Sequence, residues 1–344
     1  MPAMISNTLI AGMGMLNLGY SMIKRRLPKK YLLMGFLFTF SMILSILYNE
    51  NASWMELLWV WCFLGVALVL AQWKINSSAI LKVFLIVIAV FAVQIISGVD
   101  PQEALVGISG NNISVIVLLF VLLLYMMREE EGRKITYWPC AVAILLSLWG
   151  NGRAGMLSSG LLAVLLFLYD YIKVSKFHIS TLLKIGIVGA IAFMLVGRFF
   201  GDYLASLTAK VDYYGYTSSR TEIWAEYLHS AATSLPDFLF GVLPDVDTPL
   251  LVSYAGNTHN AFLMLHEKYG IACFIFVVYG FFKSFFTYIR SKKFVFAIMM
   301  IVWCCRSMFD WTGFPGIFDV LFFYFLIHSD TVRRKARSDP QLPD

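Results

Sequence analysis

A chain of 344 residues in which 59% are hydrophobic and only 14% are charged has too little polar surface for an ordinary water-soluble domain. In a soluble protein, the formal net charge of +6 would suggest nucleic acid as a partner. In a chain this apolar, the net charge is better explained by the excess of Lys and Arg that membrane proteins carry in their cytoplasmic loops. We therefore expect no nucleic acid as a partner. Repeated apolar stretches of about 16 to 22 residues predict an all-α polytopic membrane protein.

The first apolar stretch, residues 5–23, continues directly into Lys24-Arg25-Arg26 without the small-residue site at which a signal peptide is cleaved. We therefore interpret it as the first of about eleven transmembrane helices. Because no internal repeat or second domain is visible, we expect a single transmembrane domain over residues 1–344. The expected spans lie at about 5–23, 31–48, 54–73, 80–97, 112–127, 135–150, 154–172, 180–198, 259–282, 294–309 and 316–329.

Lysine and arginine are distributed unequally between alternate connections. With the amino terminus outside, most of the 27 Lys and Arg fall in the connections that then face the cytoplasm, as the positive-inside rule requires. These connections are 24–30, 74–79, 128–134, 173–179, 283–293 and 330–344. The cations that this topology does not require lie toward the external side, at Arg153, Arg198, Lys210, Arg220, Lys268 and Arg306.

One external connection dominates the chain. The segment 199–258, between the eighth and ninth spans, is polar, and we expect it to form a large loop or lid with short helices. Ser219, followed three residues later by Glu222, fits a capping box and predicts a helix that runs to about Thr233. The residues expected on the apolar face of this helix are Ile223, Trp224, Tyr227 and Leu228.

Arg153 follows Gly150-Asn151-Gly152, where two glycines break the chain between the sixth and seventh spans. The seventh span then begins at the external face, so its free backbone N–H groups and positive dipole end lie beside the guanidinium. That arrangement suits an anion. The alternative is an arginine that extends from a helix end to the membrane interface.

Arg220 stands in the first turn of the predicted loop helix, where a cation is unfavourable for the helix dipole unless an anion is also present. Arginine binds phosphate or carboxylate through two parallel hydrogen bonds and stays charged near a membrane interface. The alternative is an exposed loop arginine, or one paired with Glu222 or Asp212.

Histidines mark the external start of the ninth span. His259, Leu263 and His266 are spaced four and three residues apart, so we expect them on one helix face. A histidine at a helix mouth can accept a proton from a sugar hydroxyl near neutral pH, and Asn260 can orient it. The alternative is a hydrogen-bonding anchor at the interface. Together with Glu267 these histidines could suggest zinc, but the spacing is not HExxH, and we expect no metal.

Three further cations are candidates of second rank. Arg306 precedes Asp310 by four residues and Arg198 precedes Asp202 by four, so ordinary helix ion pairs could explain both. Lys210 in the lid either assists the site or is simply solvated.

Neither the cysteines nor any known nucleotide-binding motif predicts a further functional site. The cysteines lie in apolar stretches without CxxC or paired-histidine spacing, so we expect neither a disulfide framework nor a metal cluster. No P-loop, dinucleotide fingerprint or serine-nucleophile elbow appears, and we expect no cofactor. The five cysteines are Cys62, Cys140, Cys273, Cys304 and Cys305.

Taken in order, the motifs resemble those of the O-antigen polymerase and O-antigen ligase superfamily of bacterial membrane glycosyltransferases. The matching region covers about residues 145–330, whereas the part before it is similar in hydropathy alone. The resemblance rests on Arg153-Ala154-Gly155, on Ser219-Arg220-Thr221-Glu222-Ile223-Trp224, on Phe240-Gly241, and on Thr258-His259-Asn260-Ala261-Phe262-Leu263 through Gly270.

The resemblance implies a GT-C-like, metal-independent enzyme that uses undecaprenyl-diphosphate-linked oligosaccharide. It would be a multi-pass protein of the bacterial inner membrane, surrounded by membrane lipids, with its active site on the periplasmic side. By the resemblance, Arg153 and Arg220 bind the donor diphosphate and His259 acts as base on the acceptor hydroxyl or orients it. The wider substrate-binding set is Arg153, Arg220, Asn260, Arg198, Arg306 and Lys210.

Two enzymes of this kind use the same donor and differ in the acceptor. A polymerase transfers the growing glycan to the next lipid-linked repeat unit, whereas a ligase transfers it to lipid A-core. Because the lid lacks a second large elaboration for a bulky acceptor, we favour the polymerase. A lipid-linked oligosaccharide flippase is the alternative outside enzymology, although it would place charges near the membrane centre and show repeat symmetry. Whether a chain-length regulator binds is left open.

Overall fold

The computed structural model describes the chain except for residues 1, 25–26, 49–53, 55, 74, 106–108, 175–219 and 339–344. Throughout this described part the regular elements are helices, and no strand occurs. Five of them are long and apolar enough to cross a membrane: α2, α4, α5, α7 and α13. The full order is α1 (Pro2–Ile23), α2 (Lys29–Tyr48), α3 (Glu56–Gln72), α4 (Ser77–Ile96), α5 (Asn111–Glu130), α6 (Trp138–Trp149), α7 (Arg153–Val174), α10 (Arg220–Thr233), α11 (Leu235–Phe240), α12 (Pro249–Ser253), α13 (Ala261–Arg290), α14 (Phe294–Met308) and α15 (Asp319–Ser338).

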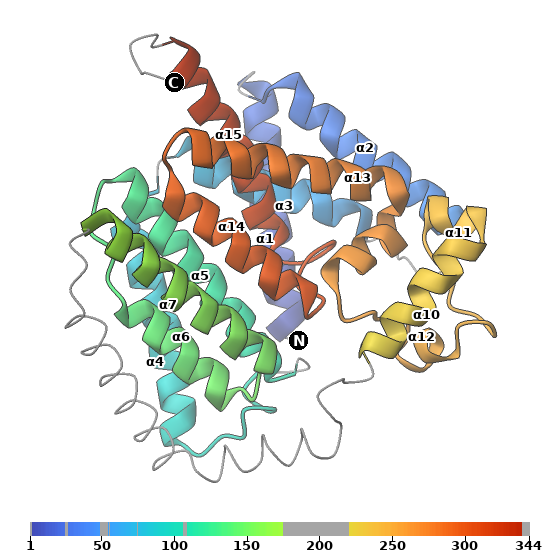
Figure 1. Cartoon of the computed structure of the whole chain (residues 1–344), viewed down its shortest axis with the longest axis horizontal. Coiled ribbons are helices and arrows are strands. Elements are labelled where there is room, and N and C mark those ends of the chain that lie inside the picture. Colours follow the sequence, from blue (N-terminus) through green and yellow to red (C-terminus); the bar gives the residue numbers. More distant parts are fainter. Residues whose placement is uncertain are drawn as a thin grey trace.

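The helices form two groups joined by α14 (Figure 1). Helices α4 to α7 lie together on one side, while α1, α2, α3, α13 and α15 form the other group. Helix α14 packs on α5 and α7 of the first group and on α13 and α15 of the second. The short helices α10, α11 and α12 lie beside α13, at one end of the bundle.

Aromatic packing fills the centre where α13, α14 and α15 meet. Trp303 of α14 is fully buried and stacks on Phe322 of α15, with 5.7 Å between the ring centroids. Its indole N–H donates to the carbonyl of Phe318 at 3.0 Å, so the buried polar end of the ring is satisfied. The end of α14 is thereby held firmly in the core.

Glycines allow α1 and α3 to approach each other closely. A Cβ at Gly14 of α1 would lie 2.1 Å from the backbone oxygen of Cys62, and a Cβ at Gly65 of α3 would lie 2.0 Å from the oxygen of Gly14. The amide of Asn17 donates to the carbonyl of Gly65 at 2.8 Å. Small residues with an interhelical hydrogen bond are typical of helix contacts within membranes.

Charged side chains at the end of the bundle opposite α10 are matched with carboxylates. Asp330 of α15 pairs with Lys30 and with Lys283, and Glu130 pairs with Lys293 at 2.7 Å. These cations come from the connections that the sequence analysis places in the cytoplasm, and they gather at one end as that topology requires.

The structure supports a helical membrane protein, whereas the number of eleven spans stays a prediction. The stretch predicted to span at 135–150 is α6, which has 12 residues and at about 1.5 Å per residue is too short to cross the hydrocarbon layer alone. The last predicted span, 316–329, begins later, at Asp319, and α15 continues to Ser338. The predicted span 180–198 lies outside the described residues, and a GT-C-like fold also stays a prediction.

The α1–α3 contact yields a test of the fold. We expect Gly14→Ala to lower the free energy of unfolding by about 1–3 kcal/mol or more, because the new methyl group meets backbone that cannot move aside. Gly12→Ala is the matched control on the same helix, since nothing lies within 4 Å of its Cβ position. Thermal unfolding of the two variants in detergent measures the difference, and equal melting temperatures would contradict this packing.

Candidate functional site

The chain reverses between α6 and α7 as predicted. Gly150 ends α6, Asn151 takes a left-handed conformation with φ 58°, and α7 begins at Arg153. Gly155 is required here, because a Cβ would lie 2.2 Å from the Cβ of Ser114 in the first turn of α5. Arg153 itself is exposed. The first turns of α5 and α7 therefore touch, and the guanidinium of Arg153 projects from the place where they meet.

Arg306 lies buried beside this contact, with 1% of its surface exposed. Its Nη2 donates to Asp310 Oδ2 at 3.0 Å and to Ser114 Oγ at 3.4 Å. The Arg306–Asp310 ion pair, given above as the alternative explanation for this arginine, is thus present. Within the described part of the chain, Nε and Nη1 of Arg306 have no hydrogen-bond partner. Buried donors without acceptors are costly, so this guanidinium retains capacity for an acceptor or a water molecule.

Arg220 is the first residue of α10 and reaches across to the end of α14. Its Nη1 donates to the backbone carbonyl of Phe309, directly before Asp310. Burial lowers the pKa of Arg220, Asp310 raises it, and the neighbouring Arg153 and Arg306 lower it. A guanidinium keeps its charge despite such a shift. Arg220 therefore lies within electrostatic range of Arg153, Arg306 and the carboxylate of Asp310.

His259 lies directly before α13 and faces the same group. Burial lowers its pKa below the ordinary value, Arg220 lowers it further, and Asp310 raises it. Its ring packs edge-on against Tyr254, with 5.7 Å between centroids. A histidine with a lowered pKa is neutral at neutral pH, which is the form that accepts a proton.

Two predictions about this segment were wrong. His259 does not share a helix face with Leu263 and His266, because it takes a left-handed conformation with φ 50° and the helix begins only at Ala261. Asn260 does not orient His259. Its side-chain oxygen caps α13 instead and accepts the N–H groups of Phe262 at 2.9 Å and Leu263 at 3.3 Å.

His266 and Lys268 have structural surroundings away from the arginines. His266 Nε2 lies 2.8 Å from the carbonyl of Phe238, which can only accept, so Nδ1 is the acceptor for the Tyr227 hydroxyl at 2.7 Å. Lys268 Nζ lies 3.9 Å from carboxylate oxygens of both Glu267 and Glu56. Neither side chain is among the groups that shift the pKa of Arg220 or His259.

The remaining predicted positions have mixed outcomes. Arg198 and Lys210 lie outside the described residues, as does Ser219 of the predicted capping box. The predicted helix after it is confirmed and ends at Thr233. On its expected apolar face, Ile223 and Tyr227 are buried and Trp224 is half-buried, whereas Leu228 is exposed. Leu228 nevertheless lies on the apolar side of the helix, because it lines an apolar cavity together with Tyr227.

Asp310 is the group whose importance sequence reasoning missed. The sequence analysis treated it only as the partner of Arg306. In the structure it also shifts the pKa of both Arg220 and His259 and so stands at the centre of the cluster. The available signal was its place directly after the apolar stretch 294–309, at the end predicted to be external.

The cluster carries an excess of positive charge beside a helix amino terminus. Arg220 and Arg306 lie near one carboxylate, that of Asp310, and Arg153 lies close enough to Arg220 to lower its pKa. The first turn of α7 adds its positive dipole end. Helix amino termini with arginines bind phosphate well. With neutral His259 nearby, the arrangement can hold a multiply charged anion next to a proton acceptor.

Comparisons with protein families, with known proteins and with solved structures found no match to this chain.

The electrostatics of His259 can be measured directly. We expect its pKa to lie below the ordinary value of about 6.5, because burial and Arg220 both disfavour the imidazolium. Arg220→Gln removes a cation and should raise this pKa, whereas Asp310→Asn removes an anion and should lower it further. NMR titration of labelled histidine, assigned with His259→Gln, distinguishes the two directions. Shifts of the same sign in both variants would refute the proposed surroundings.

Proposed function

We propose that this protein is a membrane glycosyltransferase that polymerises surface polysaccharide. It transfers the growing glycan from undecaprenyl diphosphate to the next lipid-linked repeat unit on the periplasmic side of the inner membrane, without a metal ion. The observation that carries the proposal is the cluster of Arg220, Arg306 and His259 around Asp310, with Arg153 at the start of α7 close enough to lower the pKa of Arg220. This orientation rests on the charge distribution of the sequence.

The reaction needs stabilisation of a diphosphate leaving group. As the bond between the sugar's anomeric carbon and the diphosphate oxygen breaks, negative charge develops on that oxygen. Exposed Arg153 and half-buried Arg220 are placed to contact the phosphates, and the N–H groups in the first turn of α7 add fixed donors. Preorganised positive groups of this kind stabilise the transition state more than the ground state.

The acceptor hydroxyl must lose a proton as it attacks the anomeric carbon. His259 is suited to take it, because burial and Arg220 keep the ring neutral before the reaction. The new glycosidic bond then joins the acceptor oxygen to the anomeric carbon, the proton resides on the imidazole, and undecaprenyl diphosphate departs. Asp310 stabilises the resulting imidazolium, as its raising effect on the pKa of His259 indicates.

Arg306 is suited to a positioning role. Its guanidinium is too deeply buried to meet a sugar directly, but it holds Asp310 at 3.0 Å and contacts Ser114 below the first turn of α7. It thus links the carboxylate to α5, whose first turn lies against that of α7, the helix that carries Arg153. Its remaining donors can hold a water molecule that reaches toward the phosphates.

The surface glycolipid of a strain that lacks the gene distinguishes the related activities. On a gel, lipid A-core that carries a single repeat unit supports the polymerase. Unsubstituted core, with polymer retained on undecaprenyl diphosphate, indicates a ligase instead. An unchanged glycan pattern would reject both activities.

Single substitutions test the residues. We expect Arg153→Ala, Arg220→Ala and His259→Ala each to reduce polymer formation by roughly 10²-fold or more, because each removes a group that acts in the transition state. The measurement is the chain-length distribution of surface glycan after complementation of the deletion strain.

Arg290→Ala is the matched control, because Arg290 is an exposed arginine at the other end of α13. It should leave the chains at wild-type length. All variants must reach the membrane in equal amount, as judged by immunoblot. Normal chains in the three site variants would refute the assignment.

A further inference from the structure

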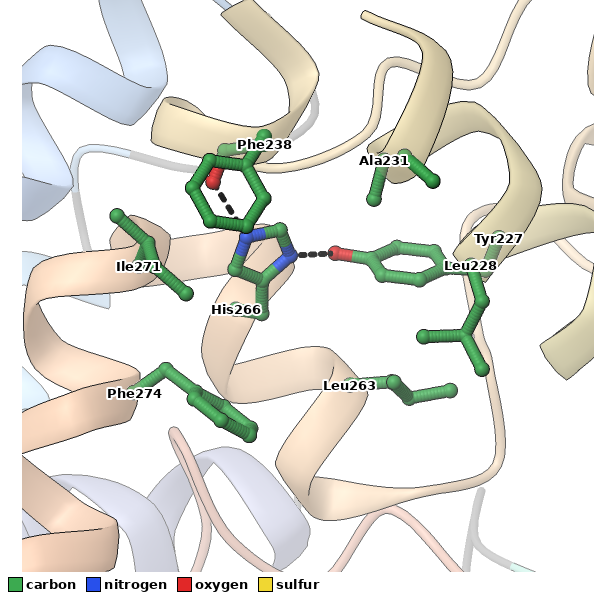
Figure 2. A pocket seen from close by; sticks show the side chains of 9 residues that line it. Tyr227, Leu228, Ala231, Phe238, Leu263, His266, Ile271 and Phe274 are labelled. Atoms are coloured by element: carbon green, nitrogen blue, oxygen red, sulfur yellow. Dashed lines mark hydrogen bonds between the residues drawn. The ribbon is translucent and has the colours of Figure 1, made fainter. Parts of the chain in front are cut away.

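A cavity of about 260 Å³ lies between the lid helices and the first turns of α13 (Figure 2). Leu228 and Ala231 of α10 and Phe238 of α11 line it on one side, and Leu263, Ile271 and Phe274 of α13 line it on the other. Its volume lies below the roughly 300 to 1,000 Å³ of sites that enclose a small molecule. It has room for part of a chain.

The polar side chains at the cavity already hydrogen-bond within the protein. Among the described residues that line it, the polar side chains are His266 and Tyr227, which hydrogen-bond to each other. The second ring nitrogen of His266 is occupied by the carbonyl of Phe238 (Figure 2). The O–H of Tyr227 and both ring nitrogens of His266 are thus occupied, and the rest of the lining is apolar, so the cavity favours a hydrocarbon.

The cavity is continuous with the lipid-facing side of α13. Ile275, Tyr279, Phe282 and Phe286 are large, exposed and spaced four, three and four residues apart, so they form one stripe along a helix long enough to cross the membrane. Ile271 of the cavity lies one turn before Ile275. A chain in the surrounding bilayer can therefore follow this stripe into the cavity.

The lid carries the same apolar surface beyond the cavity. On α11, Leu235, Phe238 and Leu239 are exposed, and on α10 Leu228 is exposed beside them. Helix α11 packs on α2 and α13, which are both long enough to cross the membrane. Contiguous apolar surface of this kind is unfavourable in water and typical of a membrane contact.

We propose that α11 and the adjoining side of α10 lie in the bilayer, and that the cavity holds an acyl chain of a membrane phospholipid. This inference goes beyond glycosyl transfer and does not depend on it. It has a consequence for the site, because α10 begins at Arg220. A chain between α10 and α13 supports the helix that presents this arginine.

Photocrosslinking of the full-length protein in nanodiscs of a single synthetic phospholipid tests the proposal. Leu228 and Phe238 are replaced one at a time by p-benzoylphenylalanine, and adducts are identified by intact mass. Val246 is the control position, because it is 91% exposed and apolar but does not line the cavity. We expect phospholipid adducts at positions 228 and 238, several-fold above position 246. Equal yields at all three positions, or no adduct at 228 and 238, would overturn it.

Filling the cavity provides a second measurement. Ala231→Trp, and the milder Ala231→Leu, should reduce the adduct at position 228 by about fivefold or more, since close-packed interiors leave no room for both groups. Ala225→Trp is the matched control, because Ala225 is exposed on the same helix and does not line the cavity. Circular dichroism and gel filtration verify folding. An undiminished adduct in a folded Ala231 variant would contradict the proposal, as would displacement of the phospholipid by equimolar polyprenyl phosphate.

Discussion

The guanidinium of Arg306 is 1% exposed at the end of α14, where it lies 3.0 Å from the carboxylate of Asp310. Removing such charges from water costs several kcal/mol per ion, and a partner must compensate for it. The pair fixes the last turn of α14, and two further segments gather there: Arg220 of α10 donates to the preceding carbonyl of Phe309, and His259 lies close enough for Asp310 to raise its pKa. Segments far apart in the sequence are thus held around one carboxylate.

The cations at the two ends of the bundle differ in their burial and in their partners. At the end that carries most lysines, Asp330 lies between Lys30 and Lys283, and Glu130 pairs with Lys293. Such cations orient the protein in the membrane and are already neutralised. At the opposite end, Arg306 is buried, and part of its guanidinium has no acceptor among the described residues. A buried guanidinium with free donors, unlike a paired lysine at the surface, retains capacity for an anion or a water molecule.

Local features of the site could be predicted from the sequence because they depend on residues close together in the chain. The start of α7 at Arg153 followed from the Gly150–Gly152 break, and the Arg306–Asp310 pair followed from a spacing of four residues. Their convergence could not be predicted, because it depends on how α7, α10 and α14 pack. The left-handed conformation of His259 and the capping of α13 by Asn260 were also not predicted. An asparagine before an apolar helix is itself a capping signal. The number of spans was less predictable still, since helix ends in apolar sequence carry weak signals.

The base of the lid is attached to α13 by backbone contacts. A Cβ at Gly241 would lie 2.3 Å from the oxygen of Glu267, and a Cβ at Gly270, where φ is 68°, would lie 2.4 Å from the oxygen of Leu239. The hydroxyl of Ser45 reaches both of the carbonyls at this contact, that of Phe240 at 2.7 Å and that of Glu267 at 2.8 Å. The end of α11 is therefore fixed to α13 at its kink.

The first turn of α10 is attached by a different kind of bond. Arg220 itself ties this turn to the bundle, through a hydrogen bond to the neutral carbonyl of Phe309. A phosphate oxygen is the stronger acceptor for a guanidinium, because the bond then joins two opposite charges. Under the proposed function, Arg220 would exchange this carbonyl for a diphosphate oxygen of the donor, and the stronger bond would favour that exchange. The base of the lid is held separately, through the close backbone contacts between α11 and α13.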